Sequence, residues 1–260
     1  MSNRRQLRPV PDLNQLPRPV FARIASWDHQ GTETRWHHHA WGQWVYAIEG
    51  VLEVHTRRAR YFAPPQFAVW IPQGEAHQII SGSAAKMRSL YIETDRLPGT
   101  RWSFPCVCEV SPLVRELVMT FCEFPAEYPL DSPHSRLVQV LLDAISELPL
   151  AANSLPLPFD KRLLLICEKL QARVNLSVNM EQLGSEVGLS GRSVSRLFKS
   201  QTGLSFQQWR QRLRLLHGVS LLEKGESITN IALACGYDSL SAFVAAFKKQ
   251  FGRSPGQYFG

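Results

Sequence analysis

Residues 186–205, EVGLSGRSVSRLFKSQTGLS, and residues 234–254, ACGYDSLSAFVAAFKKQFGRS, follow the same pattern of residue types. In each stretch, a short amphipathic segment leads to a glycine that can turn and a serine that can cap a helix. A second amphipathic segment follows and is closed by glycine. The turning glycines are Gly188 and Gly236, and the capping serines are Ser190 and Ser239. The sequence therefore predicts two helix-turn-helix units.

The second helix of the first unit is expected to have an apolar face and a basic face. Val194, Leu197 and Phe198 recur at helical spacing and should face the core. The side chains left on the opposite face are those of Arg192, Ser195, Arg196 and Lys199. A guanidinium can bond guanine in a major groove and lysine can contact phosphate. Two such units favour DNA binding over a basic face that is merely solvated.

A long helix is predicted between the two units. The stretch from Ser205 to about Glu223 has Phe206, Trp209 and Leu213 on one side. A helix of this length spans about 28 Å. Successive major-groove faces on one side of B-DNA lie about 34 Å apart, so the helix can hold the two units one turn of DNA apart.

The charge is unevenly divided along the chain. The net charge is +7, with 14 Lys and Arg against 7 Asp and Glu in residues 156–260, and 15 of each kind in residues 1–155. A basic region joined to a neutral one indicates that the first meets a polyanion and the second meets something else.

Residues 21–97 are predicted to form a small barrel of short strands. Segments rich in β-branched and aromatic residues alternate there with Gly, Pro and charged turns, most clearly at residues 44–48, 51–55, 68–71 and 89–92. Residues 1–20 begin with basic residues but have no apolar core, so we expect a flexible arm and not a secretory signal.

Residues 98–158 are predicted to form a helical linker region. Apolar residues at helical spacing predict helices over Ser111–Phe124 and Ser135–Glu147. Two roles are open for their apolar faces: an interface in a homodimer, or packing on the barrel of the same chain. Prolines at 149, 156 and 158 then interrupt helix before the basic domain, residues 159–260.

The composition is that of an ordinary globular protein, with 44% hydrophobic and 20% charged residues and no apolar run long enough to cross a bilayer. The five cysteines are odd in number and scattered, which fits a reducing compartment better than a disulfide framework. Cys106 and Cys108 are expected to be two reduced thiols. We therefore expect a cytoplasmic protein without a membrane partner.

Residues 36–44, WHHHAWGQW, place three of the eight histidines in a row. Neutral imidazole is the commonest transition-metal ligand, and only alternate residues of a strand share a face. If this stretch is a strand, His37 and His39 converge while His38 points away.

Residues from about 159 to 259 resemble the DNA-binding domain of the AraC/XylS family of transcription regulators. The resemblance is carried by GLSGRSVSRLFKSQTGLSFQQW, by the stretch Arg212–Leu216 and by SITNIALACGYDSLSAFVAAFKKQFGRSPGQY. Because members of this family place the second helix of each unit in the major groove, the resemblance implies base reading by Arg192, Ser195 and Arg196. Lys199 would then contact phosphate.

The second unit departs from the family pattern. Leu240, Ser241 and Val244 stand at base-reading positions where many members carry glutamine, threonine or arginine. An apolar side chain can touch a thymine methyl but makes no bidentate bond, so weaker readout is expected here. Lys248 and Lys249 are expected to contact phosphates.

The first half resembles the cupin sensor domains of one branch of this family. His37, His39 and Gln43 stand where cupins carry their first motif, and residues 72–77, PQGEAH, resemble the second motif with His77. The resemblance implies a divalent transition metal held by His37, His39 and His77. A glutamate normally stands where Gln43 is, and a neutral amide should lower metal affinity. A structural role for the histidines as barrel lining is weighed equally.

An effector pocket is predicted inside the barrel. The residues assigned to it are Trp36, His37, His39, Gln43, Trp44, Tyr46, Trp70 and His77. Aromatic rings with a few polar groups are typical of a small-molecule pocket.

The leading hypothesis is therefore a transcription regulator, and not an enzyme, that binds promoter DNA in response to a small molecule, with RNA polymerase as a further partner. The alternative is a metal-dependent cupin enzyme, such as an oxygenase, fused to a nucleic-acid-binding domain. A third hypothesis, architectural DNA binding, requires no preferred promoter.

Overall fold

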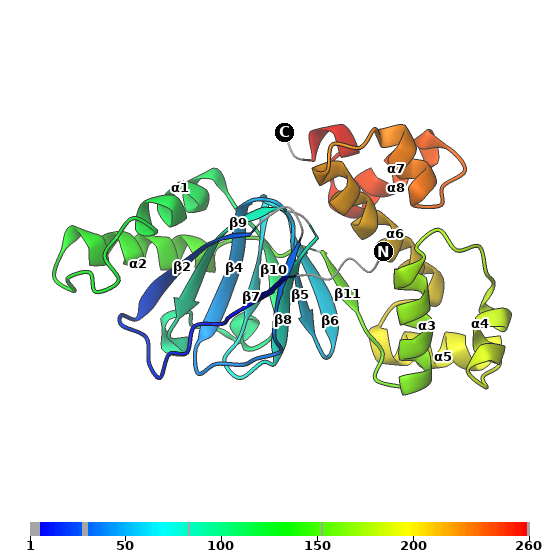
Figure 1. Cartoon of the computed structure of the whole chain (residues 1–260), viewed down its shortest axis with the longest axis horizontal. Helices are drawn as coiled ribbons and strands as arrows, with labels where there is room; N and C mark the ends of the chain where they lie inside the picture. Colours follow the sequence, from blue (N-terminus) through cyan, green and yellow to red (C-terminus); the bar gives the residue numbers. More distant parts are fainter. Residues whose placement is uncertain (1–5, 28–30, 83, 152, 259–260) are drawn as a thin grey trace. The chain divides into compact units, whose positions relative to one another are not determined.

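The computed structural model describes residues 6–27, 31–82, 84–151 and 153–258, and it divides into two compact units (Figure 1). The first unit is Met1–Thr56 with Tyr61–Ser154, and the second is Arg57–Arg60 with Leu155–Gly260. The first is rich in strands and the second contains helices, so the predicted order of a strand-rich domain followed by a helical domain, an α+β fold, is confirmed.

Two sheets form most of the first unit. The strands are β1 (Gln6–Arg8), β2 (Val20–Trp27), β3 (Thr32–Thr34), β4 (Gly42–Glu49), β5 (Leu52–Thr56), β6 (Ala59–Ala63), β7 (Phe67–Ile71), β8 (His77–Ser81), β9 (Ala85–Ile92), β10 (Cys106–Glu109) and β11 (Ser154–Pro156). A six-stranded sheet has the order β1-β3-β8-β5-β6-β11 and a five-stranded sheet the order β10-β7-β4-β9-β2. The predicted barrel thus consists of two separate sheets.

The five-stranded sheet packs against two helices of the same chain, α1 (Pro112–Phe121) and α2 (Pro133–Ser146) (Figure 1). Ser111 caps α1 by accepting a hydrogen bond from the backbone N–H of Val114. The apolar faces of both helices share one core with the sheet, formed by Trp44, Tyr46, Trp70, Leu90, Val114, Val118, Phe121, Leu141 and Ile145 among others. Of the two roles open for these faces, packing on their own domain is therefore the one observed.

Two predicted boundaries differ from the structure. Within the predicted flexible arm, Gln6–Arg8 pairs in parallel with β3, and the Arg18 guanidinium donates to the carbonyl of Tyr128 at 2.7 Å; residues 1–5 lie outside the described part. The predicted linker region joins the first unit up to Ser154, because β10 pairs with β7 and the helices cover the sheet. Backbone pairing between distant segments decides both boundaries.

The second unit contains α3 (Lys161–Ala172), α4 (Met180–Glu186), α5 (Gly191–Thr202), α6 (Phe206–Glu223), α7 (Ile228–Ala234) and α8 (Leu240–Phe251). Both predicted helix-turn-helix units are confirmed as α4–α5 and α7–α8, joined by the predicted long helix α6. Ser190 and Ser239 cap α5 and α8, and the turning glycines Gly188 and Gly236 have φ of 71° and 73°. Within the described residues, no helix is long and apolar enough to span a membrane.

Gly42, at the start of β4, leaves room for the ring of Trp70. A Cβ at position 42 would lie 2.0 Å from Cη2 of Trp70, whose indole N–H donates to the carbonyl of Trp102 at 2.7 Å. We expect Gly42→Ala to lower the free energy of unfolding by about 1–3 kcal/mol, as overpacking does. Gly82→Ala is the control, since a Cβ there meets no atom within 4 Å. Urea titrations with equal midpoints for the two variants would contradict this.

Candidate functional site

Helix α5 carries the predicted basic face on its exposed side. Val194 and Phe198 are fully buried, whereas Arg192, Arg196 and Lys199 are exposed and Ser195 is half-buried. The ammonium of Lys199 donates to the carbonyl of Gly203 at 2.8 Å, so it also closes the end of α5. Two guanidinium groups in the first half of a helix have the placement that major-groove readout requires.

Two close contacts hold the turn between α4 and α5. The Glu181 carboxylate accepts a hydrogen bond of 2.6 Å from the N–H of Gly191, the first residue of α5. A Cβ at position 191 would lie 2.7 Å from that carboxylate, and a Cβ at Gly184 would lie 2.5 Å from the carbonyl of Leu189. An acceptor at a helix N-terminus is electrostatically favourable. Glu181 therefore braces α5, a role that the sequence pattern did not indicate.

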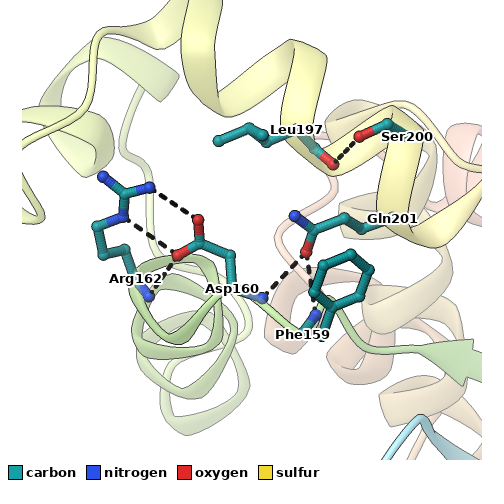
Figure 2. Close-up of polar contacts among 6 residues, drawn as sticks. All are labelled: Phe159, Asp160, Arg162, Leu197, Ser200 and Gln201. Carbon is teal, nitrogen blue, oxygen red and sulfur yellow. Dashed lines mark hydrogen bonds and ion pairs between the residues drawn. The ribbon is translucent and has the colours of Figure 1, made fainter.

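The chain that enters this domain is fastened to α5 and α6. Figure 2 shows the amide oxygen of Gln201, near the end of α5, accepting hydrogen bonds of 3.0 Å from the N–H groups of both Phe159 and Asp160. Asp160 in turn caps α3 and pairs with Arg162 at 2.8 Å. The Trp209 indole N–H donates to the carbonyl of Pro156 at 2.7 Å. The predicted linker is thus held by specific hydrogen bonds at its end.

Helix α8 presents a less polar surface than α5. Leu240, Ser241, Lys248 and Lys249 are exposed and Val244 is half-buried, while Phe243 and Phe247 are buried beneath them. The three base-reading candidates on α8 and its two lysines therefore have the accessibility that their predicted roles need. Those roles remain predictions.

Three histidines come together in the first unit. His37 forms a β-bridge with His77, the first residue of β8, and His39 lies in the loop before β4. One ring nitrogen from each of the three lies within 4.8 Å of the others. His38 is exposed, as predicted. The predicted strand through residues 36–44 begins only at Gly42, so the β-bridge and the loop bring the histidines together.

The backbone fixes the orientation of the three rings. Each Nδ1 lies against a backbone carbonyl: His37 on Arg35 at 2.9 Å, His39 on Trp41 at 2.6 Å, and His77 on Glu75 at 2.9 Å. A carbonyl only accepts, so each Nδ1 carries the proton and each Nε2 keeps a lone pair. Imidazoles that bind a metal typically donate their other ring N–H to such a carbonyl, which fixes the orientation of the ring.

The lone pairs of the imidazoles meet a further acceptor. The side-chain oxygen of Gln43 lies 3.1 Å from Nε2 of His39 and 3.2 Å from Nε2 of His77. Nε2 of His37 is buried and makes no hydrogen bond. Acceptors that face one another are stabilised by a cation between them, so the residues fit a metal.

Burial lowers the pKa of all three imidazoles. Desolvation is the largest cause for each, and the neighbouring His37 lowers the pKa of His77 further, to about 3. The rings are therefore neutral at pH 7, which is the state that binds metal.

Four of the predicted pocket residues lie elsewhere. Trp36 is 51% exposed, while Trp44, Tyr46 and Trp70 belong to the core between the sheet and the helices. Along β4, Gln43 faces the other sheet, so Trp44 faces the helices. Of the predicted set, His37, His39, Gln43 and His77 are brought together.

Residues outside the predicted set complete the surroundings of the histidines. The Trp41 ring stacks on His39 with centroids 5.4 Å apart, and the Tyr91 ring lies 5.5 Å from His39. With Val10–Asn14, His38, His39 and Ala40, these rings line a cavity of about 140 Å³. The Tyr91 hydroxyl accepts a hydrogen bond of 3.2 Å from Arg23. Tyr91 and Arg23 could be found only from the sheet register, which places Tyr91 opposite Gln43.

The lowered histidine pKa values predict acid sensitivity. The unfolded chain protonates these histidines near their ordinary pKa of 6.5, whereas folded His77 stays neutral down to about pH 3. The unfolded state thus binds more protons in this window, and stability falls as pH falls, by up to ~1.4 kcal/mol per pH unit for each such histidine. In urea titrations of chelator-treated protein, His77→Gln should show a smaller loss from pH 7 to pH 5 than the native chain. Equal losses would contradict the burial of a neutral ring.

Comparisons with known proteins agree with this two-part organisation. The family model of an AraC-like ligand binding domain matches residues 21–153, and that of a helix-turn-helix domain matches residues 183–260. The HTH-type transcriptional regulator NimR of Escherichia coli is 33% identical over 243 residues, which are 91% of this chain and 87% of that protein.

Other similarities are more limited. The HTH-type transcriptional regulator MtrA of Neisseria gonorrhoeae is 36% identical over 100 residues, 38% of this chain and 33% of that protein. The structure of ToxT from Vibrio cholerae aligns with 93% of this chain and 98% of its own, at 10% identity and a TM-score of 0.39. From the two family models and the near full-length match to NimR, the chain belongs to the AraC family of helix-turn-helix transcription regulators that carry an N-terminal ligand-binding domain.

Proposed function

We propose that this regulator reads its promoter mainly through α5 and that the cavity beside the three histidines receives its small-molecule signal. The observation that carries the first part is the exposed pair Arg192 and Arg196 on a helix braced by Glu181. Mapping of the binding sites across the genome identifies the operator and tests the proposal. Binding without sequence preference would instead support the architectural hypothesis.

Arg196 is the sharpest test of base reading. Arg196→Ala should weaken operator binding by about 1–3 kcal/mol and relax preference at one or two base pairs, because a bidentate base contact is lost. Lys199→Ala is the matched control on the same face and should weaken binding to all sequences alike. A gel-shift titration of Arg196→Ala with unchanged affinity and preference would show that another face of α5 enters the groove.

We propose that the second unit contributes less to specificity. Leu240, Ser241 and Val244 offer no guanidinium, so they favour contact with thymine methyl groups over bidentate bonds. Scrambling the operator bases under α5 should cost more affinity than scrambling those under α8. Equal losses in a competition gel shift would rule out this division.

The histidine cluster is proposed to hold a divalent transition metal through His37, His39 and His77, with the Gln43 oxygen as a fourth, weaker ligand. Bound there, the metal would supply a Lewis-acidic position for an effector atom. The support is the convergence of three lone pairs oriented by backbone carbonyls. Three imidazoles without a carboxylate should give modest affinity.

Metal analysis tests this site. We expect His39→Ala to lose the metal and His38→Ala, the exposed neighbour, to retain it, because only His39 turns its ring into the cluster. Elemental analysis of proteins purified side by side makes the measurement. Retention of metal by both variants, or its absence from the native protein after incubation with Zn²⁺, would leave the histidines as lining of the cavity.

The enzymatic alternative shares this cluster. The family assignment favours a regulator. Turnover of a small molecule by metal-loaded protein, lost in His39→Ala, would favour the enzyme.

As a regulator the protein would act in the cytoplasm and contact RNA polymerase at its promoter. A homodimer interface on α1 and α2 would use residues of these helices that remain exposed, such as Leu113 and Val140.

A further inference from the structure

Arg23 is a buried cation in the sensor domain. Arg23 lies in the middle of β2 and is only 9% exposed. Its guanidinium donates to the Tyr91 hydroxyl at 3.2 Å and to the carbonyl of Pro9 at 3.1 Å, both neutral acceptors. In the part of the chain that the structure describes, no carboxylate forms an ion pair with it. A buried charge without a counter-charge is costly, and an anionic ligand would supply the missing opposite charge.

The sheet face around Arg23 carries further unused donors. Ser89 lies directly opposite Arg23 in the β2–β9 register, is fully buried, and its hydroxyl makes no hydrogen bond. Gln43 lies opposite Tyr91 in the β4–β9 register, is fully buried, and its amide nitrogen is likewise unbonded. Donors in excess of acceptors match a ligand that is rich in acceptors.

The cavity of about 140 Å³ borders this group of residues through Tyr91 and the segment that follows Pro9. Tyr91 lines it and binds Arg23 through its hydroxyl, and Val10, which follows the Arg23 partner Pro9, lines it as well. The rings of Trp41 and Tyr91, with centroids 5.6 Å apart, form one wall. Aromatic walls favour a flat apolar body. Asp12, the one acidic residue in the lining, is exposed, so solvent screens its charge.

We propose that Arg23 recognises the carboxylate of a small, flat effector, with Ser89 and Gln43 as additional donors. The inference rests on the proposed sensing role of this cavity and names the chemical class of its ligand. A guanidinium binds a carboxylate through two parallel hydrogen bonds, which gives both charge and orientation. The carboxylate would replace the neutral acceptors that Arg23 now has.

The test uses the full-length protein, treated with chelator so that no metal competes for carboxylates. Benzoate, picolinate and cinnamate are compared with their neutral amides in thermal unfolding. At least one carboxylate should raise the Tm more than its amide does, and Arg23→Gln should abolish the difference. Arg23→Lys keeps the charge but loses the paired geometry, and it should weaken apparent affinity about tenfold.

Two control variants separate this cavity from other basic surfaces. Arg88→Gln removes a charge from β9 on the opposite face of the sheet, and Arg196→Gln removes one from the DNA-binding helix. Both should keep the carboxylate response. Loss of the response in Arg196→Gln but not in Arg23→Gln would show that the anions bind the DNA-binding domain and would overturn the inference.

A measurement without ligand guards against a merely structural role. Arg23→Met removes the buried charge and keeps the length of the side chain, so the ligand-free protein should not lose stability, and its Tm should stay level or rise. A Tm lower by several degrees would mean that Arg23 serves the fold. If no carboxylate raises the Tm more than its amide does, the inference fails. The proposed function would still stand if the protein binds its operator and a neutral effector changes that binding.

Discussion

Strand β4 carries side chains to both layers of the sensor domain, and the rest of the domain depends on this alternation. From one residue to the next the strand turns Gln43 toward the histidines and Trp44 toward α1 and α2. Both faces are buried, so a shift of the register by one residue would bury the amide in the helix core and expel an indole from it. Gly42 fixes the start of the strand, since only glycine leaves room for the Trp70 ring.

The pairing of this strand with β9 also positions the polar residues next to the cavity. The β4–β9 register sets Gln43 opposite Tyr91, and the β2–β9 register sets Ser89 opposite Arg23. These polar residues are positioned by backbone pairing that the apolar core between sheet and helices stabilises. Groups that the fold holds in place beforehand lose less conformational freedom when a ligand binds to them.

The DNA-binding domain uses a different means of fixing its functional surface. Helix ends and turns, and not strand registers, determine where α5 points: Ser190 caps it, Glu181 binds its first N–H, and Gly184 allows close passage of the turn. Gln201 on the same helix accepts hydrogen bonds from the backbone of Phe159 and Asp160, so the first residues of this domain are attached to α5. In the second unit, Ser239 likewise caps α8, but Leu240 stands at the position that Gly191 has in α5. This apolar residue makes the exposed surface of α8 less polar than that of α5.

The sequence alone determined the helix-turn-helix repeat, its caps and turning glycines, the long helix between the units and the faces of α5, because these features depend on residues within a few positions of one another. It also indicated the convergence of His37, His39 and His77, although the strand assumed for residues 36–44 was wrong. The tertiary structure decided which aromatic residues surround the histidines, the pairing of Arg23 with Tyr91, the packing of α1 and α2 on their own sheet and the attachment of Gln6–Arg8 to β3. Each of these depends on the register between strands distant in sequence or on which face of a sheet a helix covers. Local patterns do not encode that information, since a strand buried on both faces reads as apolar whichever way its residues alternate.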